Sequence, residues 1–317
     1  MPEHEELFPA AEEEDEEEEP HHGDGEPVRF CRLTRESISQ GLSLLCHTGN
    51  GLGHVFVKLD LIDKRLNDIT AISSYVHLRF LDVSNNHLTD LSPLASLTQL
   101  LWLKVDNNAV ERPGNVFALL NYLQWLNLAA NQITDLTDVA GPALETLNLT
   151  RNRIQRASLR GPCFANLVTL ELRENHLDTT NGIDIPNLRH LYLAKNVIRR
   201  LEGLEKLERV TTLHLRDNQL ETLDGLSPQM KCLKYLNVRG NSIKDESALQ
   251  SLRVVSNSLQ ALVVSDNPLA ETSDYRLNVL TLLPQLERLD KDAVSPEERS
   301  DVQERIQEHE EEEIPNP

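Results

Sequence analysis

One pattern constrains this chain more than any other feature: the motif LxxLxLxxNxL, with Leu, Val or Ile at the apolar positions, recurs along most of its length. The steps between successive motif Asn residues are 22, 23, 21, 23, 21, 22, 23 and 26 residues. A degenerate first copy runs from Phe56 to Leu66, with Lys64 at the Asn position. The full copies carry Asn86, Asn108, Asn131, Asn152, Asn175, Asn196, Asn218, Asn241 and Asn267.

This period and motif are typical of leucine-rich repeats, which have about 20–29 residues each. The LxL part alternates at period two, which predicts a short strand with one buried face. The Asn follows where the chain turns inward, and its amide can pair with backbone groups that the turn leaves open. Leu spaced by three in the second half predicts 3₁₀ turns on the outer side. We therefore predict an α/β solenoid of about ten repeats with parallel strands on its concave face.

The ends of the chain differ from the repeats. A solenoid must cover its last layers, and Thr34 can N-cap a helix running to about Leu45. We predict an N-terminal helical cap over residues 28–53, repeats over 54–270 and a C-terminal leucine-rich-repeat cap over 271–294. Residues 1–27 carry 13 acidic residues and no Lys or Arg, which predicts a disordered tail. Residues 295–317 carry 9 acidic and 2 basic residues, which predicts a partly helical tail, solvated or docked on a basic partner.

Catalytic signatures are missing from the sequence. Gly49–Gly53 lacks the Lys and Ser/Thr of a phosphate-binding loop, and neither HExxH nor GxSxG occurs. The four cysteines lie at least 15 residues apart, so no CxxC pair exists. No secretory signal or membrane-spanning run is present. We expect an intracellular, non-catalytic protein with reduced thiols, without cofactor, metal or small-molecule substrate.

The concave face offers candidate binding residues. Phe80, Trp102 and Trp125 share one position in three consecutive repeats, which predicts an aromatic patch about 10 Å long. Such rings bind a partner, pack only on each other or are covered by one of the tails. Arg173, Arg216 and Arg239 share another position, and nearby acids indicate a protein interface rather than nucleic acid. His190 and His214 face the same arc, as surface contacts or, less simply, as metal ligands. The candidate partner-binding residues are Phe80, Trp102, Trp125, Arg173, His190, Tyr192, His214, Arg216, Tyr235 and Arg239.

Several sequence runs that contain more than the generic repeat residues indicate a particular family of leucine-rich-repeat proteins. Six such runs resemble the family of leucine-rich repeat-containing protein 23: Gly41–Cys46, Thr48–Leu52, Asn86–Leu94, Leu101–Lys104, Thr212–Gln219 and Leu286–Lys291. The resemblance covers about residues 36–300. It implies a component of axonemal radial spokes in cilia and the sperm flagellum, located in the cytoskeleton, that binds radial spoke proteins. From the charge pattern and the absence of a long apolar run, we expect no nucleic-acid or membrane partner.

Two other functions fit the same repeat type. One is a regulatory subunit that binds a protein phosphatase through its concave face. The other is an acidic nuclear histone-binding repeat protein. In that class a long acidic tail follows a few repeats, whereas here the acidic residues stand at both ends of about ten repeats.

Overall fold

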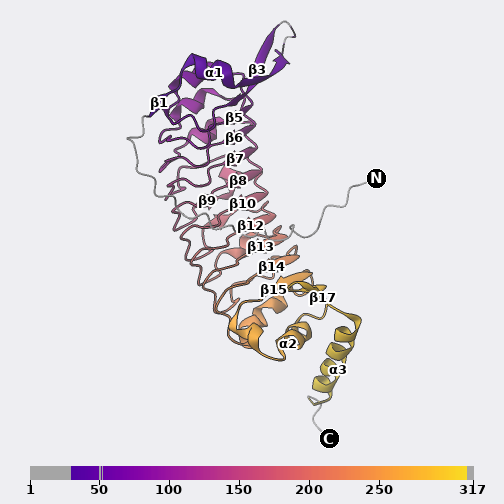
Figure 1. Cartoon of the computed structure of the whole chain (residues 1–317). Helices are drawn as coiled ribbons and strands as arrows, with labels where there is room; N and C mark the ends of the chain where they lie inside the picture. Colours follow the sequence, from indigo (N-terminus) through magenta and orange to yellow (C-terminus); the bar gives the residue numbers. More distant parts are fainter. Residues whose placement is uncertain (1–29, 50, 52, 313–317) are drawn as a thin grey trace.

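A computed structural model describes residues 30–49, 51 and 53–312 of the 317-residue chain. The predicted acidic segment 1–27 lies outside the described residues. The chain winds into an elongated solenoid whose repeat strands are stacked along one side (Figure 1). Among the described residues, no helix is long and apolar enough to cross a lipid bilayer.

The strands of the repeats form one sheet that runs the length of the solenoid. Apart from the longer β3, each strand consists of three residues centred on the first Leu of LxL, and neighbouring repeat strands pair in parallel. The repeat strands are β3 (His54–Asp60), β5 (Phe80–Asp82), β6 (Trp102–Lys104), β7 (Trp125–Asn127), β8 (Thr146–Asn148), β10 (Thr169–Glu171), β12 (His190–Tyr192), β13 (Thr212–His214), β14 (Tyr235–Asn237) and β15 (Ala261–Val263).

The interior is filled by the Leu, Ile and Val residues of the motif. Leu81, Leu103 and Leu126, at the centres of successive strands, are fully buried and lie in register. Many repeats carry a 3₁₀ helix on their outer side, which confirms the prediction from Leu spaced by three. These helices are η1 (Thr70–Ser74), η2 (Ser92–Ser96), η3 (Val116–Leu119), η4 (Gly161–Phe164), η5 (Leu204–Lys206), η6 (Glu246–Val255) and η7 (Pro268–Glu271).

The motif Asn residues form the ladder that the sequence predicts. Asn175 is typical: its Nδ2 donates to the carbonyls of Leu172 at 3.2 Å and of Leu149, in the preceding repeat, at 2.9 Å. Its Oδ1 accepts from the backbone N–H of Ile154 at 3.1 Å. Each Asn thus joins two layers and satisfies buried backbone groups that the inward turn leaves unpaired. The residue before the Asn has a left-handed backbone in most repeats, as at Glu174 (φ 53°).

The N-terminal cap is only partly helical. Thr34 does cap helix α1 (Arg35–Gly41), accepting from Ser37 N–H, but the helix ends at Gly41. The next residues form β2 (Leu42–His47), an antiparallel partner of β3, so the prediction of a helix to about Leu45 is wrong. A Cβ on Gly41 would lie 2.3 Å from the Asp60 carbonyl oxygen, so only glycine fits where the chain passes from α1 into β2. Strand β1 (Cys31–Arg32) pairs in parallel with β4 (Leu66–Asp68).

The C-terminal cap contains helix α2 (Tyr275–Leu282), the short strands β16 (Arg288–Leu289) and β17 (Asp292–Ala293), and helix α3 (Pro296–Glu312). Helix α3 is not simply a solvated charged helix. Val302 is only 4% exposed and belongs to the core, and Arg276 of α2 pairs with Glu298 of α3. Val302 and the partly buried Ile306, one turn further on, thus hold this helix against the last layer together with the Arg276–Glu298 pair.

Candidate partner-binding face

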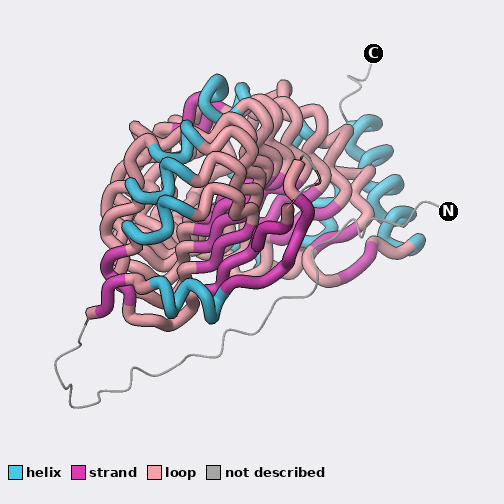
Figure 2. The backbone as a smooth tube through the Cα atoms, turned by 90° about the horizontal axis from the view of Figure 1, so that it is seen from above, coloured by secondary structure: helices cyan, strands magenta, loops and turns pink. Residues whose placement is uncertain are grey.

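Two rows of side chains point outward from the repeat strands. The first row contains the residue before each central Leu, and the second row contains the residue after it. Because the strands pair in register, each row runs straight across neighbouring repeats. Viewed along the solenoid, the strands gather on one face and the short helices lie on another (Figure 2). The first row includes Phe80, Trp102, Trp125, Thr146, Thr169, His190, Thr212 and Tyr235.

Trp102 and Trp125 form a stacked pair in the first row. Their ring centroids are 4.7 Å apart and their planes differ by 8°. Both side chains remain partly exposed, and Phe80 is the next first-row residue. The rings therefore pack on each other and still present a face to solvent. The predicted alignment of the three aromatic residues is confirmed, whereas binding of a partner to them stays a prediction.

Charged side chains border this aromatic pair. The ammonium group of Lys104 lies 3.9 Å from a carboxylate oxygen of Asp82 and 3.7 Å from one of Asp106. Burial raises the pKa of the Asp106 carboxyl above its ordinary value, and the nearby Lys104 partly opposes that shift. An aromatic centre with a polar rim is the arrangement found in many protein–protein interfaces.

A second aromatic cluster lies further along the same face, where the sequence showed only separate candidates. The rings of Tyr192 and His214 are 5.0 Å apart, and those of His214 and Tyr235 are also 5.0 Å apart. The Arg173 guanidinium carbon lies 4.7 Å from the centre of the Tyr192 ring, a cation–π geometry. Burial, followed by the charge of Glu171, raises the pKa of the Tyr192 phenol, so its hydroxyl stays protonated at neutral pH.

His190 and His214 lie in different rows of the concave face. His190 belongs to the first row, opposite Thr212, while His214 belongs to the second row, opposite Tyr192. Within the part of the chain that the structure describes, no three His, Cys, Asp or Glu side chains gather in a way that could hold a metal ion. The geometry favours surface contacts for both histidines.

The three arginines that share one position in the repeats each form an ion pair with a carboxylate. Arg173 lies 3.4 Å from Glu171, Arg216 lies 3.1 Å from Asp217, and Arg239 lies 2.6 Å from Asp266. Each pair joins a guanidinium nitrogen to a carboxylate oxygen. This face therefore has mixed charge, unlike the continuous basic surface that binds nucleic acid.

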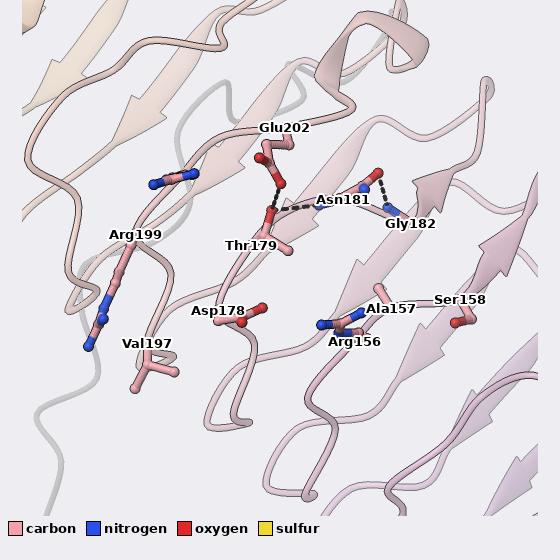
Figure 3. A pocket seen from close by; sticks show the side chains of 11 residues that line it. Arg156, Ala157, Ser158, Asp178, Thr179, Asn181, Gly182, Val197, Arg199 and Glu202 are labelled. Atoms are coloured by element: carbon pink, nitrogen blue, oxygen red, sulfur yellow. Dashed lines mark hydrogen bonds between the residues drawn. The ribbon is translucent and has the colours of Figure 1, made fainter.

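A pocket of about 710 Å³ lies elsewhere, among residues that follow the ladder Asn of three repeats (Figure 3). Arg156, Arg199 and Arg200 contribute to its lining. The repeat motif did not predict this pocket. Arginine at the fourth position after a motif Asn was the available signal, but only the stacking of repeats shows that these side chains share one pocket.

These features define the chain as a leucine-rich-repeat protein. A family model described as "Leucine-rich repeat" matches residues 169–316, and another, "Leucine Rich Repeat", matches residues 77–97. An internalin of Listeria monocytogenes has the same fold: its crystal structure gives a TM-score of 0.51 at 18% identity, covering 78% of this chain and 84% of that one.

The chain belongs to the family of leucine-rich repeat-containing protein 23. It is 47% identical to the protein of that name from Bos taurus over 278 residues, covering 86% of this chain and 79% of that protein. It is 46% identical to the protein from Homo sapiens over 290 residues, covering 89% and 82%. The sequence resemblance is thereby confirmed, and the chain is a protein-interaction repeat protein.

Proposed function

We propose that this chain is a non-catalytic adaptor of the axonemal radial spoke, where it supports spoke-head assembly and motility of cilia and sperm flagella. The observation that carries its role as a binding protein is the stacked Trp102–Trp125 pair, partly exposed on the concave face. The axonemal assignment rests on the sequence runs that resemble leucine-rich repeat-containing protein 23.

The solenoid suits an adaptor because contacts between every pair of neighbouring repeats hold its shape. In-register strand pairing on one side and the Asn ladder inside connect each repeat to the next. A stacked array of this kind keeps its binding residues at set spacings, so little conformational entropy is lost when a partner binds.

The concave face supports a protein partner more than other ligands. Large aromatic side chains are enriched among the residues that dominate protein–protein binding, especially where polar residues surround them. Here Asp82, Lys104 and Asp106 border the tryptophans, and the arginines further along have carboxylate neighbours. We therefore propose radial spoke proteins as the partners and the cytoskeleton of the axoneme as the location.

The binding site is tested by the double variant Trp102→Ala/Trp125→Ala in a pull-down from flagellar extract. Truncating a residue that dominates an interface costs about 2 kcal/mol or more, which is roughly a 30-fold loss of affinity. The matched control is Tyr122→Ala, since Tyr122 is an exposed aromatic residue outside the repeat strands. Circular dichroism checks that each variant is folded. Unchanged recovery of spoke proteins by the double variant would contradict the site.

The cellular role is tested separately by imaging a tagged full-length chain in flagellated cells. We expect signal along the axoneme that resists detergent extraction together with spoke proteins. Co-purification with a phosphatase catalytic subunit in place of spoke proteins would favour the phosphatase-regulatory function. Nuclear accumulation with histones would favour the third function.

A further inference from the structure

The pocket of about 710 Å³ is lined by residues that follow the ladder residues Asn152, Asn175 and Asn196. Figure 3 shows the side chains of its lining. Hydrogen bonds join several residues of the lining to one another. The Thr179 hydroxyl donates to the Glu202 carboxylate at 2.7 Å, and the Gly182 N–H donates to Asn181 Oδ1 at 2.9 Å. The Glu202 carboxylate is therefore already engaged by the pocket itself.

Two of the three repeats that line this pocket carry Arg four positions after the ladder Asn: Arg156 and Arg200. In three repeats outside the pocket that residue is an Asp that caps the following turn. Asp90 Oδ1, for example, accepts from Ser92 N–H at 2.8 Å, and Asp135 does the same for Thr137 at 2.8 Å. The position is Thr in two further repeats and Arg112 in one that does not line the pocket. At the pocket, two arginines at this position place positive charge around the cavity.

Positive charge exceeds negative charge around this pocket. Among the described residues, neither Arg156 nor Arg200 forms an ion pair or a side-chain hydrogen bond, whereas Arg199 Nε donates to Gln219 Oε1 at 2.9 Å. Asp178 and Glu202 are the carboxylates of the lining. The stretch from 151 to 216 holds 12 Lys and Arg against 7 Asp and Glu, although the repeats as a whole are neutral. The pocket thus suits a ligand with clustered carboxylates.

The N-terminal segment of the chain joins the solenoid on the flank that holds the pocket. Strand β1 pairs with β4, and the β4 residues follow Lys64 as the pocket residues follow their ladder Asn. One backbone hydrogen bond per repeat continues this flank: His87 N–H donates to Leu66 O at 2.8 Å, and Val197 N–H donates to Leu177 O at 3.0 Å. In Figure 1, β1 and β9 (Leu159–Arg160) lie on the same side of the solenoid.

We infer that the arginine pocket binds the chain's own acidic run, residues 12–19, in cis. These eight consecutive Asp and Glu residues precede Phe30, where the described chain begins, by 11 to 18 residues. Arg156 and Arg200 lie five and seven repeats from β1, about 24–34 Å at a strand spacing of about 4.8 Å. Eleven extended residues span up to about 36–40 Å, which reaches both. A short tether also gives an effective concentration on the order of millimolar, enough for weak ionic contacts to matter.

Zero-length carbodiimide cross-linking of full-length protein at low micromolar concentration tests this inference. Arg156→Lys and Arg200→Lys, made singly, keep the charge and add an amine that reacts with a touching carboxylate. The control is Arg209→Lys, because the Arg209 side chain donates to Asn187 Oδ1 at 2.9 Å, outside the pocket. Mass spectrometry then identifies which position is joined to the peptide containing residues 12–19.

We expect the cross-link at positions 156 and 200 in the monomeric fraction and much less of it at position 209. Its yield should fall severalfold in 1 M salt, where the Debye length is about 3 Å. Replacing every acidic residue of 12–19 by Gln or Asn should abolish it. An absent cross-link, equal yields at all three positions, or a cross-link found only between two chains would each overturn the inference.

Discussion

Replacing Asn175 with Ala would test the central physical claim, that inward amides hold the layers together. Asn175 is 4% exposed, and its Oδ1 accepts the only hydrogen bond that Ile154 N–H is seen to make. Its Nδ2 donates to three carbonyls, and each of them accepts a second hydrogen bond. Arg173 O also accepts from Arg151 N–H at 3.0 Å. Leu149 O also accepts from Asn152 at 3.0 Å, and Leu172 O also accepts from Asn196 at 2.9 Å.

The expected loss of stability in Asn175→Ala follows from these hydrogen bonds. Ile154 N–H becomes a buried donor without an acceptor, which costs about 1–3 kcal/mol, while the carbonyls each lose one of two bonds at a smaller cost. We expect a total destabilisation of about 2–4 kcal/mol. Because a repeat protein distributes stability over neighbouring layers, the loss should concentrate in the repeats around Asn175.

Urea denaturation followed by circular dichroism measures the change, and amide hydrogen exchange locates it at Ile154. Asn166→Ala is the matched control: Asn166 is an exposed Asn that donates to Pro142 O at 2.9 Å, and water can replace that bond, so less than about 1 kcal/mol is expected. If Asn175→Ala were no more destabilising than Asn166→Ala, or if Ile154 kept its exchange protection, the ladder argument would be refuted.

Two further predictions concern a tight turn and the C-terminal cap. Gly182→Ala should destabilise the protein by more than about 1 kcal/mol, since Gly182 has φ +88° and an added Cβ would lie 1.7 Å from the Ala157 carbonyl oxygen; a melting temperature equal to that of wild type would contradict this. The hydrogen bond from Arg276 lowers the pKa of Glu298 below its ordinary value of 4.5, so the ionised carboxylate stabilises the docked helix α3 above that pH, and the contribution disappears as pH falls through the lowered pKa. The melting temperature of wild type should therefore exceed that of Glu298→Gln at pH 7, and the difference should shrink as the pH is lowered below 4.5. A difference that persists unchanged in acid would contradict the assignment.

The repeat architecture could be predicted from the sequence because its forces are local and repeated. Leu at strand and turn positions, and Asn at the inward turn, report burial and hydrogen bonding within one repeat or between neighbours. The same register predicted that Phe80, Trp102 and Trp125 would align, and the structure places them so. The caps were harder to predict because their sequences do not follow the repeat motif and occur only once in the chain. At Gly41, where α1 ends, the backbone lies so close to Asp60, 19 residues further along the chain, that only glycine fits.

The sequence alone determined the fold class, the parallel strands, the Asn ladder and the acidic character of both ends, because each depends on residues a few positions apart or one repeat apart. Only the tertiary structure decided which side chains meet across repeats. It placed Tyr192 and Tyr235 on either side of His214, docked α3 through Val302, and brought Arg156 and Arg200 to one pocket. These contacts depend on side-chain direction and on stacking geometry, which a motif specifies for its own repeat and not for its neighbours.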